Sequence, residues 1–210
     1  MLAKDFRRQA WDSLSNQWGS VILIYFVFIL ITSAAGLISV VGLIISGPLT
    51  LGFTQIYMSI IRKNRKPEVG HLFEGFDNFS NSLILYLVNN IFIALWSLLF
   101  IVPGIIKSYS YSMSYYILAD NPKMGGNEAR IKSMQMMKGN KWRLFCLDFS
   151  FIGWDLLCLL TLGILSFWVT PYRQAAYAAF YQNLLVEQGL IDVNEPVMPE
   201  DFVESAPTDV

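Results

Sequence analysis

The sequence is poor in charged side chains and in the residues that most enzymes use for chemistry. Only 15% of its 210 residues are charged, against about 25% in average globular chains. It has one histidine and two cysteines. It also lacks a Gly-x-Ser-x-Gly nucleophile turn, a Walker-type phosphate loop and a dinucleotide-binding glycine pattern. We therefore expect neither an enzyme nor a protein that needs a cofactor.

The cysteines and the single histidine are placed unfavourably for a disulfide or a metal site. Cys146 and Cys158 are expected on one helix, where their spacing separates them by roughly 18 Å, beyond the reach of a disulfide. His71, Glu74 and Asp77 recur every three residues, but on a helix they fan out too widely to converge on an ion. We therefore expect two core thiols and no metal site.

What the sequence does have is three long apolar stretches, each interrupted by one proline. They are 19–61, 80–119 and 144–186, with Pro48, Pro103 and Pro171. Each stretch is about 40 residues long, roughly twice the ~20 that a helix needs to cross a bilayer. This predicts an all-α integral membrane protein with about six transmembrane helices, arranged as three hairpins.

The hairpins are predicted to be pseudo-repeats within a single membrane domain, 1–190, with units at about 1–61, 69–119 and 127–186. Each unit places a polar residue two positions before an aromatic one: Asn16 and Trp18, Asp77 and Phe79, Asn140 and Trp142. We expect the polar residue to cap the following helix and the aromatic residue to lie at headgroup depth.

A short amphipathic helix is expected ahead of each apolar stretch, at 2–14, 69–76 and 127–138. In the first, Leu2, Phe6, Ala10 and Leu14 recur every four residues. In the third, Ile131, Met134 and Met137 share one face. Such helices lie either on the membrane surface or against the cytoplasmic end of the bundle, and the sequence leaves both arrangements open.

Each proline is expected in the first turn of the second helix of its hairpin, where its missing N–H has no partner to lose. The second helices would then be 48–61, 104–119 and 172–186. Helices of this length fall short of the ~30 Å hydrocarbon core. They either span with help from preceding residues or are re-entrant, and six full spans are favoured.

The basic residues predict the orientation. Thirteen Lys and Arg residues fall on the side of the polar segments and two, Lys107 and Arg173, on the other. This asymmetry places both termini in the cytoplasm of a multi-pass cell-membrane protein. An uncleaved first span is favoured over a cleaved signal because the apolar pattern continues to Ile61. The basic residues lie in short loops beside spans, so nucleic acid is not an expected partner.

The last part of the chain has a different composition. From Glu187 onward there are seven acidic residues and no Lys or Arg. Together with three prolines, this predicts a disordered acidic tail over 191–210. Membrane lipids and protein partners at the cytoplasmic face are the expected contacts. The oligomeric state stays open.

Several motifs in a fixed order resemble a known family. They are Ser46-Gly47-Pro48-Leu49-Thr50-Leu51-Gly52, Phe73-Glu74-Gly75-Phe76, Ile101-Val102-Pro103-Gly104, Tyr109-Ser110-Tyr111-Ser112-Met113, Asp120-Asn121-Pro122 and Phe151-Ile152-Gly153-Trp154. The chain resembles the bacterial integral membrane family known as domain of unknown function 975 over nearly all of 6–185. It is also distantly similar to the membrane domain of some glycerophosphodiester phosphodiesterases, but it has no catalytic domain of that kind. The resemblance implies a membrane location and no particular reaction.

Ionisable residues inside the apolar stretches form the candidate site. Lys107 and Arg173 follow two of the prolines, and Asp148 and Asp155 are seven residues apart, on one face if their helix is continuous. With Tyr177 they are expected either to line a polar cavity or to join helices structurally, and the structural interpretation is favoured. Asp155 is expected near the midplane, with Arg173 or Lys107 as its partner.

Three classes of function follow from these expectations. A non-enzymatic membrane scaffold or regulatory protein, using its surface helices and tail, is the favoured class. The alternative is a small transporter, channel or lipid-binding bundle that uses the polar residues. An intramembrane enzyme is the weakest class, because no catalytic motif is visible.

Overall fold

The computed structural model describes residues 3–36, 39–62, 65–99 and 101–191, and these residues form helices and contain no strand. The amphipathic and apolar elements alternate along the chain as the sequence predicts. The first segment contains α1 (Ala3–Leu14), α2 (Trp18–Gly36) and α3 (Ser39–Arg62). The predicted disordered tail, apart from Ile191, lies outside the described residues.

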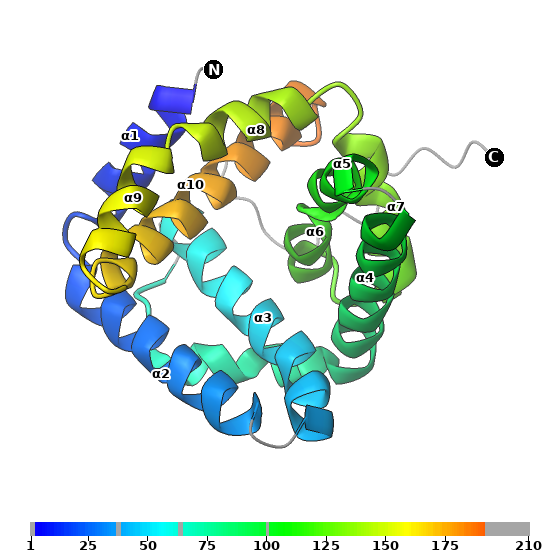
Figure 1. Ribbon diagram of the computed structural model, residues 1–210, viewed down its shortest axis with the longest axis horizontal. Helices are drawn as coiled ribbons and strands as arrows, with labels where there is room; N and C mark the ends of the chain where they lie inside the picture. Colours follow the sequence, from blue (N-terminus) through cyan, green and yellow to red (C-terminus); the bar gives the residue numbers. More distant parts are fainter. Residues whose placement is uncertain (1–2, 37–38, 63–64, 100, 192–210) are drawn as a thin grey trace.

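The second segment begins with a 3₁₀ helix, η1 (Val69–Asn78), followed by α4 (Phe79–Leu99), α5 (Ile101–Tyr111) and α6 (Ser114–Asp120). The third contains α7 (Gly126–Met136), α8 (Lys141–Phe149), α9 (Ile152–Leu160) and α10 (Ser166–Glu187). Figure 1 shows α3 crossing the middle of the molecule, with α2 at one edge, α4 and α5 at a second, and α8 and α9 along a third beside α10.

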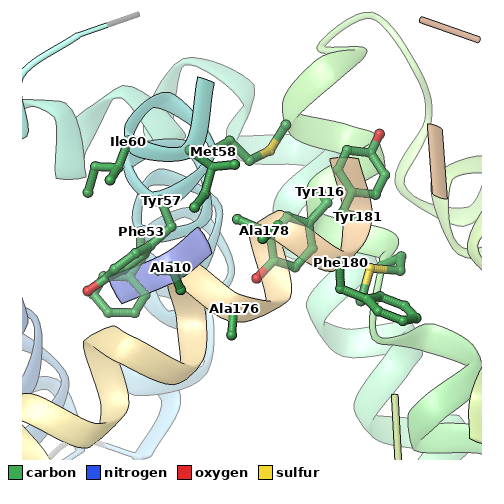
Figure 2. Close-up of a cluster of buried hydrophobic side chains, with 14 of the residues drawn as sticks. Ala10, Phe53, Tyr57, Met58, Ile60, Tyr116, Ala176, Ala178, Phe180 and Tyr181 are labelled. Carbon is green, nitrogen blue, oxygen red and sulfur yellow. The ribbon is translucent and has the colours of Figure 1, made fainter. Parts of the chain in front are cut away.

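The core lies between α3, α6 and α10, one inner helix from each segment. Figure 2 shows Tyr57 of α3, Tyr116 of α6 and Phe180 of α10 meeting in one cluster with Ala10 of α1. Each of these side chains is buried. The alanines of α10, including Ala176 and Ala178, allow neighbouring helices to pack closely.

The outer helices carry large apolar side chains on their exposed faces. Leu98 of α4 is 88% exposed, and Leu162, in the turn after α9, is 94% exposed. α2, α5 and α9 also present leucine, isoleucine or phenylalanine outward, and α9 buries none of its residues. A soluble protein rarely exposes so much apolar surface, which fits helices that face lipid.

Two helices in the described part of the chain are long and apolar enough to cross a membrane, Gly42–Arg62 and Val69–Leu98. A third span results if Ala3–Leu14 and Trp18–Ala34, which meet at 100°, count as one broken span. The third apolar stretch supplies no helix that passes the same test among the described residues. The structure therefore supports two or three spans directly.

The amphipathic helices pack on the bundle. α1 runs antiparallel to α10: Phe6 contacts Phe180, and Trp11 contacts Tyr172. Its predicted apolar face is correct, since Phe6, Ala10 and Leu14 are buried. The face predicted for the third amphipathic helix is only partly right: Met137 is buried, but Ile131 is exposed, and α7 instead buries Ala129, Ser133 and Met136.

Two prolines do not open their helices. Pro48 lies well inside α3 and Pro171 inside α10, whereas Pro103 does lie in the first turn of α5. The inner helices α3 and α10 are therefore longer than predicted. In apolar surroundings a helix end exposes backbone groups that cannot reach water, so continuing through a proline is favoured over ending there.

Two helices predicted to be continuous are broken. At each break, a side chain from an amphipathic helix forms a hydrogen bond with a free backbone group. Between α5 and α6, Ser133 of α7 accepts a hydrogen bond from the Met113 N–H at 3.2 Å and donates to the Ser110 carbonyl at 2.8 Å. Between α8 and α9, Arg7 of α1 donates to the Ser150 carbonyl at 2.9 Å. The second break places Cys146 and Cys158 on different helices.

The predicted side-chain cap of the third unit does not form. Asn140 occupies the N-cap position of α8, but its side chain makes no capping hydrogen bond. Its amide donates back to the Met136 carbonyl at 3.1 Å, and its oxygen accepts from Arg143 at 2.9 Å. Asn140 thus joins the end of α7 to α8.

Candidate polar sites between the helices

The five residues predicted as one polar cluster divide into three groups. In the first, the Asp148 carboxylate accepts hydrogen bonds from the hydroxyls of Tyr177 at 2.6 Å and Tyr109 at 2.8 Å. These residues come from α8, α10 and α5. A carboxylate with two short hydroxyl donors is well satisfied away from water, so Asp148 ties three helices together.

The second group pairs Arg173 of α10 with Asp155 of α9 in an ion pair. Arg173 is thus one of the two partners that the sequence suggested for Asp155. The Arg173 guanidinium also lies over the Phe151 ring, 5.3 Å from its centroid. Asp155 itself is not deeply buried, because its side chain is 49% exposed within the protein.

Lys107 stands apart from both groups. Its ammonium lies over the Trp96 ring, 5.2 Å from the centroid, which is a cation–π contact between neighbouring helices α5 and α4. Nor do Asp148 and Asp155 share a helical face, because the break at Ser150 and Phe151 lies between them. The structure therefore does not gather the predicted residues into one site.

A buried ion pair that sequence reasoning missed joins the inner helices. Arg62, the last residue of α3, donates to both oxygens of Asp120, the last residue of α6, at 2.6 and 2.7 Å. Their side chains are only 10% and 3% exposed. The Tyr181 hydroxyl of α10 donates to Asp120 at 2.9 Å.

One sequence signal could have indicated this pair. Asp120 ends an apolar helix and directly precedes Asn121-Pro122, a pattern that is also typical of a helix stop. Arg62 likewise adjoins a run of basic residues that includes Lys63, Arg65 and Lys66. A lone carboxylate at the end of an apolar helix needs a buried partner, and an arginine at the end of another inner helix is a natural candidate.

A fourth polar contact joins α8 to the end of α10. Arg143 donates to both oxygens of Glu187, at 2.6 and 2.9 Å, and to the Asn183 side chain at 2.9 Å. These hydrogen bonds from the Arg143 guanidinium lower the pKa of the Glu187 carboxyl from its ordinary value of 4.5. Glu187 is therefore ionised near neutral pH and holds α8 against α10.

Among the described residues, these polar groups hold one another and no constellation typical of catalysis is visible. No three His, Cys, Asp or Glu side chains lie close enough together there to hold a metal ion. His71 lies 3.8 Å from Glu74, and Glu74 also faces Arg65 at 3.4 Å. The geometry is that of polar ties between helices.

The fold and these contacts define an all-helical protein with candidate membrane-spanning helices, an apolar core and polar ties between its helices. The chain belongs to the family described as "Protein of unknown function (DUF975)", whose profile matches residues 1–107 and 100–188. No curated protein and no solved structure matches the chain. The distant similarity to glycerophosphodiester phosphodiesterase membrane domains thus rests on the sequence resemblance alone.

Proposed function

We propose that this protein is a multi-pass protein of the cell membrane, built from three pseudo-repeated hairpins that cross the bilayer six times with both termini in the cytoplasm. The recurring order of amphipathic element, outer helix and inner helix supports this arrangement. So does the Arg62–Asp120 pair, because it brings the C-terminal ends of α3 and α6 to the same side.

We propose that its role is that of a non-enzymatic scaffold or regulatory protein. The observation that carries this proposal is that the polar groups between the helices form hydrogen bonds and ion pairs with one another. Asp120, Asp148 and Asp155 each hold a side chain of α10. Residues committed to joining helices favour a structural role over the handling of a substrate.

The alternative is a small transporter, channel or lipid-binding bundle with a polar intramembrane cavity. Asp148, Tyr109 and Tyr177 favour it, because an ionisable residue between membrane helices often marks a solute or proton path. Tyr116 and Gln174 extend this polar region through a hydrogen bond of 3.2 Å. Access of water to these residues distinguishes the two proposals.

Thiol accessibility in native membranes tests which proposal holds. With Cys146 and Cys158 replaced by serine, single cysteines are placed at Ser110, Ser114 and Tyr177, and a small water-soluble thiol reagent is added. The scaffold predicts protection at all three, since Ser110 and Ser114 are buried. A cysteine at Thr161, which is exposed, is the labelled control. Labelling at the interior positions would instead support the transporter.

Protein partners at the cytoplasmic face are tested by site-specific photocrosslinking in cells. The crosslinker replaces Ile131, which α7 exposes, and in a matched variant it replaces Leu98 on the apolar face of α4. A scaffold predicts a discrete protein adduct at Ile131 and only lipid adducts at Leu98. The same adducts at both positions would argue against a docking role for α7.

A further inference from the structure

An aromatic groove lies where α1, α2, α9 and α10 meet. Its volume is about 310 Å³, within the range of pockets that hold small organic ligands. Four tryptophans and a tyrosine line it: Trp11, Trp18, Trp154, Trp168 and Tyr172. Three of the tryptophans are exposed, so the groove opens to the surroundings of the protein.

The lining favours an apolar occupant, because all seven of its residues are apolar or aromatic. Two of its lining residues, Trp154 and Leu165, flank a stretch in which Leu160, Leu162 and Ile164 are exposed. An acyl chain that enters from the lipid side would thus remain in apolar surroundings along its length.

A guanidinium group lies beside this groove. Tyr172 packs on Phe151 with ring centroids 5.2 Å apart, and Arg7 lies over the same Phe151 ring at 6.0 Å. Arg7 donates one hydrogen bond, to the Ser150 carbonyl, and forms no ion pair with any described residue. Its Nε atom is buried and has no partner there. Arg173 lies over the same Phe151 ring, 5.3 Å from its centroid, and also has a buried Nε without a partner.

Buried N–H donors without an acceptor are unfavourable, and a phosphate oxygen is a strong acceptor for a guanidinium. The carboxylates near this cluster include those of Asp155 and Asp12. Asp155 is already paired with Arg173, and Asp12 lies within electrostatic reach of Tyr172, as Arg7 does. The charge of Arg7 therefore remains available to an anion.

We propose that the groove binds one acyl chain of a membrane glycerophospholipid, whose phosphate accepts hydrogen bonds from Arg7 and Arg173. The proposal rests on the membrane location proposed above. It makes the lipid a specific ligand that joins the amphipathic helix α1 to the third hairpin.

Quenching of tryptophan fluorescence by a brominated lipid tests this proposal. The probe is phosphatidylglycerol with bromine on its acyl chains, added to the purified full chain in detergent. Replacing Trp96 and Trp142 by phenylalanine leaves only the four tryptophans of the groove. We expect saturable quenching at about one lipid per protein. R7Q should weaken binding about tenfold, equivalent to about 1.4 kcal/mol, while R8Q, at an exposed neighbouring position, should leave it unchanged.

Two comparisons keep the proposal falsifiable if R7Q folds poorly. L165F narrows the groove and should reduce quenching. Brominated diacylglycerol, which lacks the phosphate, should bind the unmodified groove about tenfold more weakly than the phospholipid. Equal binding of the two lipids would overturn the phosphate contact, and quenching that rises without saturation would overturn the groove itself. Recovery of the chain in the soluble fraction of cells would instead refute the membrane location.

Discussion

At the scale of single residues, the ion pair between Arg62 and Asp120 is the most consequential contact in the described part of the molecule. It is nearly inaccessible, bidentate and supported by Tyr181. Each charge was removed from water when the protein folded, so each depends on the other for compensation. A contact of this kind fixes which helix ends meet, even where an apolar pair would be equally stable.

D120N should therefore destabilise the protein strongly. Removing one partner of a buried pair leaves an uncompensated guanidinium and costs about 3–5 kcal/mol. R65Q is the matched control, because Arg65 and Glu74 are 3.4 Å apart with side chains 62% and 42% exposed, and such pairs contribute about 0–1 kcal/mol. Thermal unfolding in detergent should show a large fall in the melting temperature for D120N and not for R65Q. Similar unfolding curves for the two variants would mean that the Arg62–Asp120 pair is dispensable.

Glu187 should make stability fall in acid. Because the Arg143 guanidinium lowers the pKa of Glu187 below 4.5 in the folded protein, its contribution is present above that ordinary value and is lost as the pH falls through the lowered pKa. E187Q should reduce the stability difference measured between about pH 6 and about pH 3. An unchanged difference in E187Q would show that other carboxylates control the acid response.

At the scale of elements, the closest packing in the second segment joins η1 to α3. A Cβ added at Gly75 would overlap the Pro48 carbonyl oxygen, and one added at Gly52 would overlap the Leu72 carbonyl oxygen. Glycine at both positions lets the backbones meet. This contact fixes η1 beside α3 and so determines where α4 begins.

G75A should weaken the protein by about 1–3 kcal/mol, the usual cost of overpacking a tight contact. Gly70 lies in the same 3₁₀ helix and has open space around it, so G70A should leave stability within about 1 kcal/mol of the original. Denaturation of the two variants in the same detergent compares them directly. An equal loss of stability in G75A and G70A would mean that helix propensity, and not the contact with α3, causes the effect.

The sequence predicted the positions of the elements better than their continuity. The amphipathic helices and apolar stretches follow from periodicity and length, which are local properties. The helix breaks at Met113 and Ser150 do not follow from local properties, because each depends on a side chain from another helix. Ser133 forms hydrogen bonds at the first break and Arg7 at the second. The prolines were misplaced for a related reason: what a helix does at Pro48 depends on whether its end can reach water.

The candidate site was predictable in its residues and not in their grouping. Asp148, Asp155 and Arg173 are conspicuous in apolar sequence. Their partners depend on how far each helix is displaced along its neighbours, and spacing alone carries no information on that. Arg62 and Asp120 were missed because both lie at helix ends, where charged residues are ordinary.

At the scale of the whole molecule, the three proposed hairpins have their turns on one side of the membrane and their amphipathic elements on the other. The exposed apolar faces of α2, α4 and α9 would face lipid, while α3, α6 and α10 form the interior. The paired ends of α3 and α6 lie on the cytoplasmic side in this arrangement, where the basic residues are concentrated.

The measurement that tests this most directly is labelling of single cysteines in intact cells with a membrane-impermeant thiol reagent, after Cys146 and Cys158 are replaced by serine. Sites at Ala34, Ser97 and Thr161 lie near the three hairpin turns, and sites at Glu68, Asn127 and Gln188 lie near the amphipathic elements and the end of α10. We expect the first three sites to be labelled from outside and the others only after permeabilisation. Thr161 and Asn127 labelled from the same side would contradict the third hairpin and the architecture proposed here.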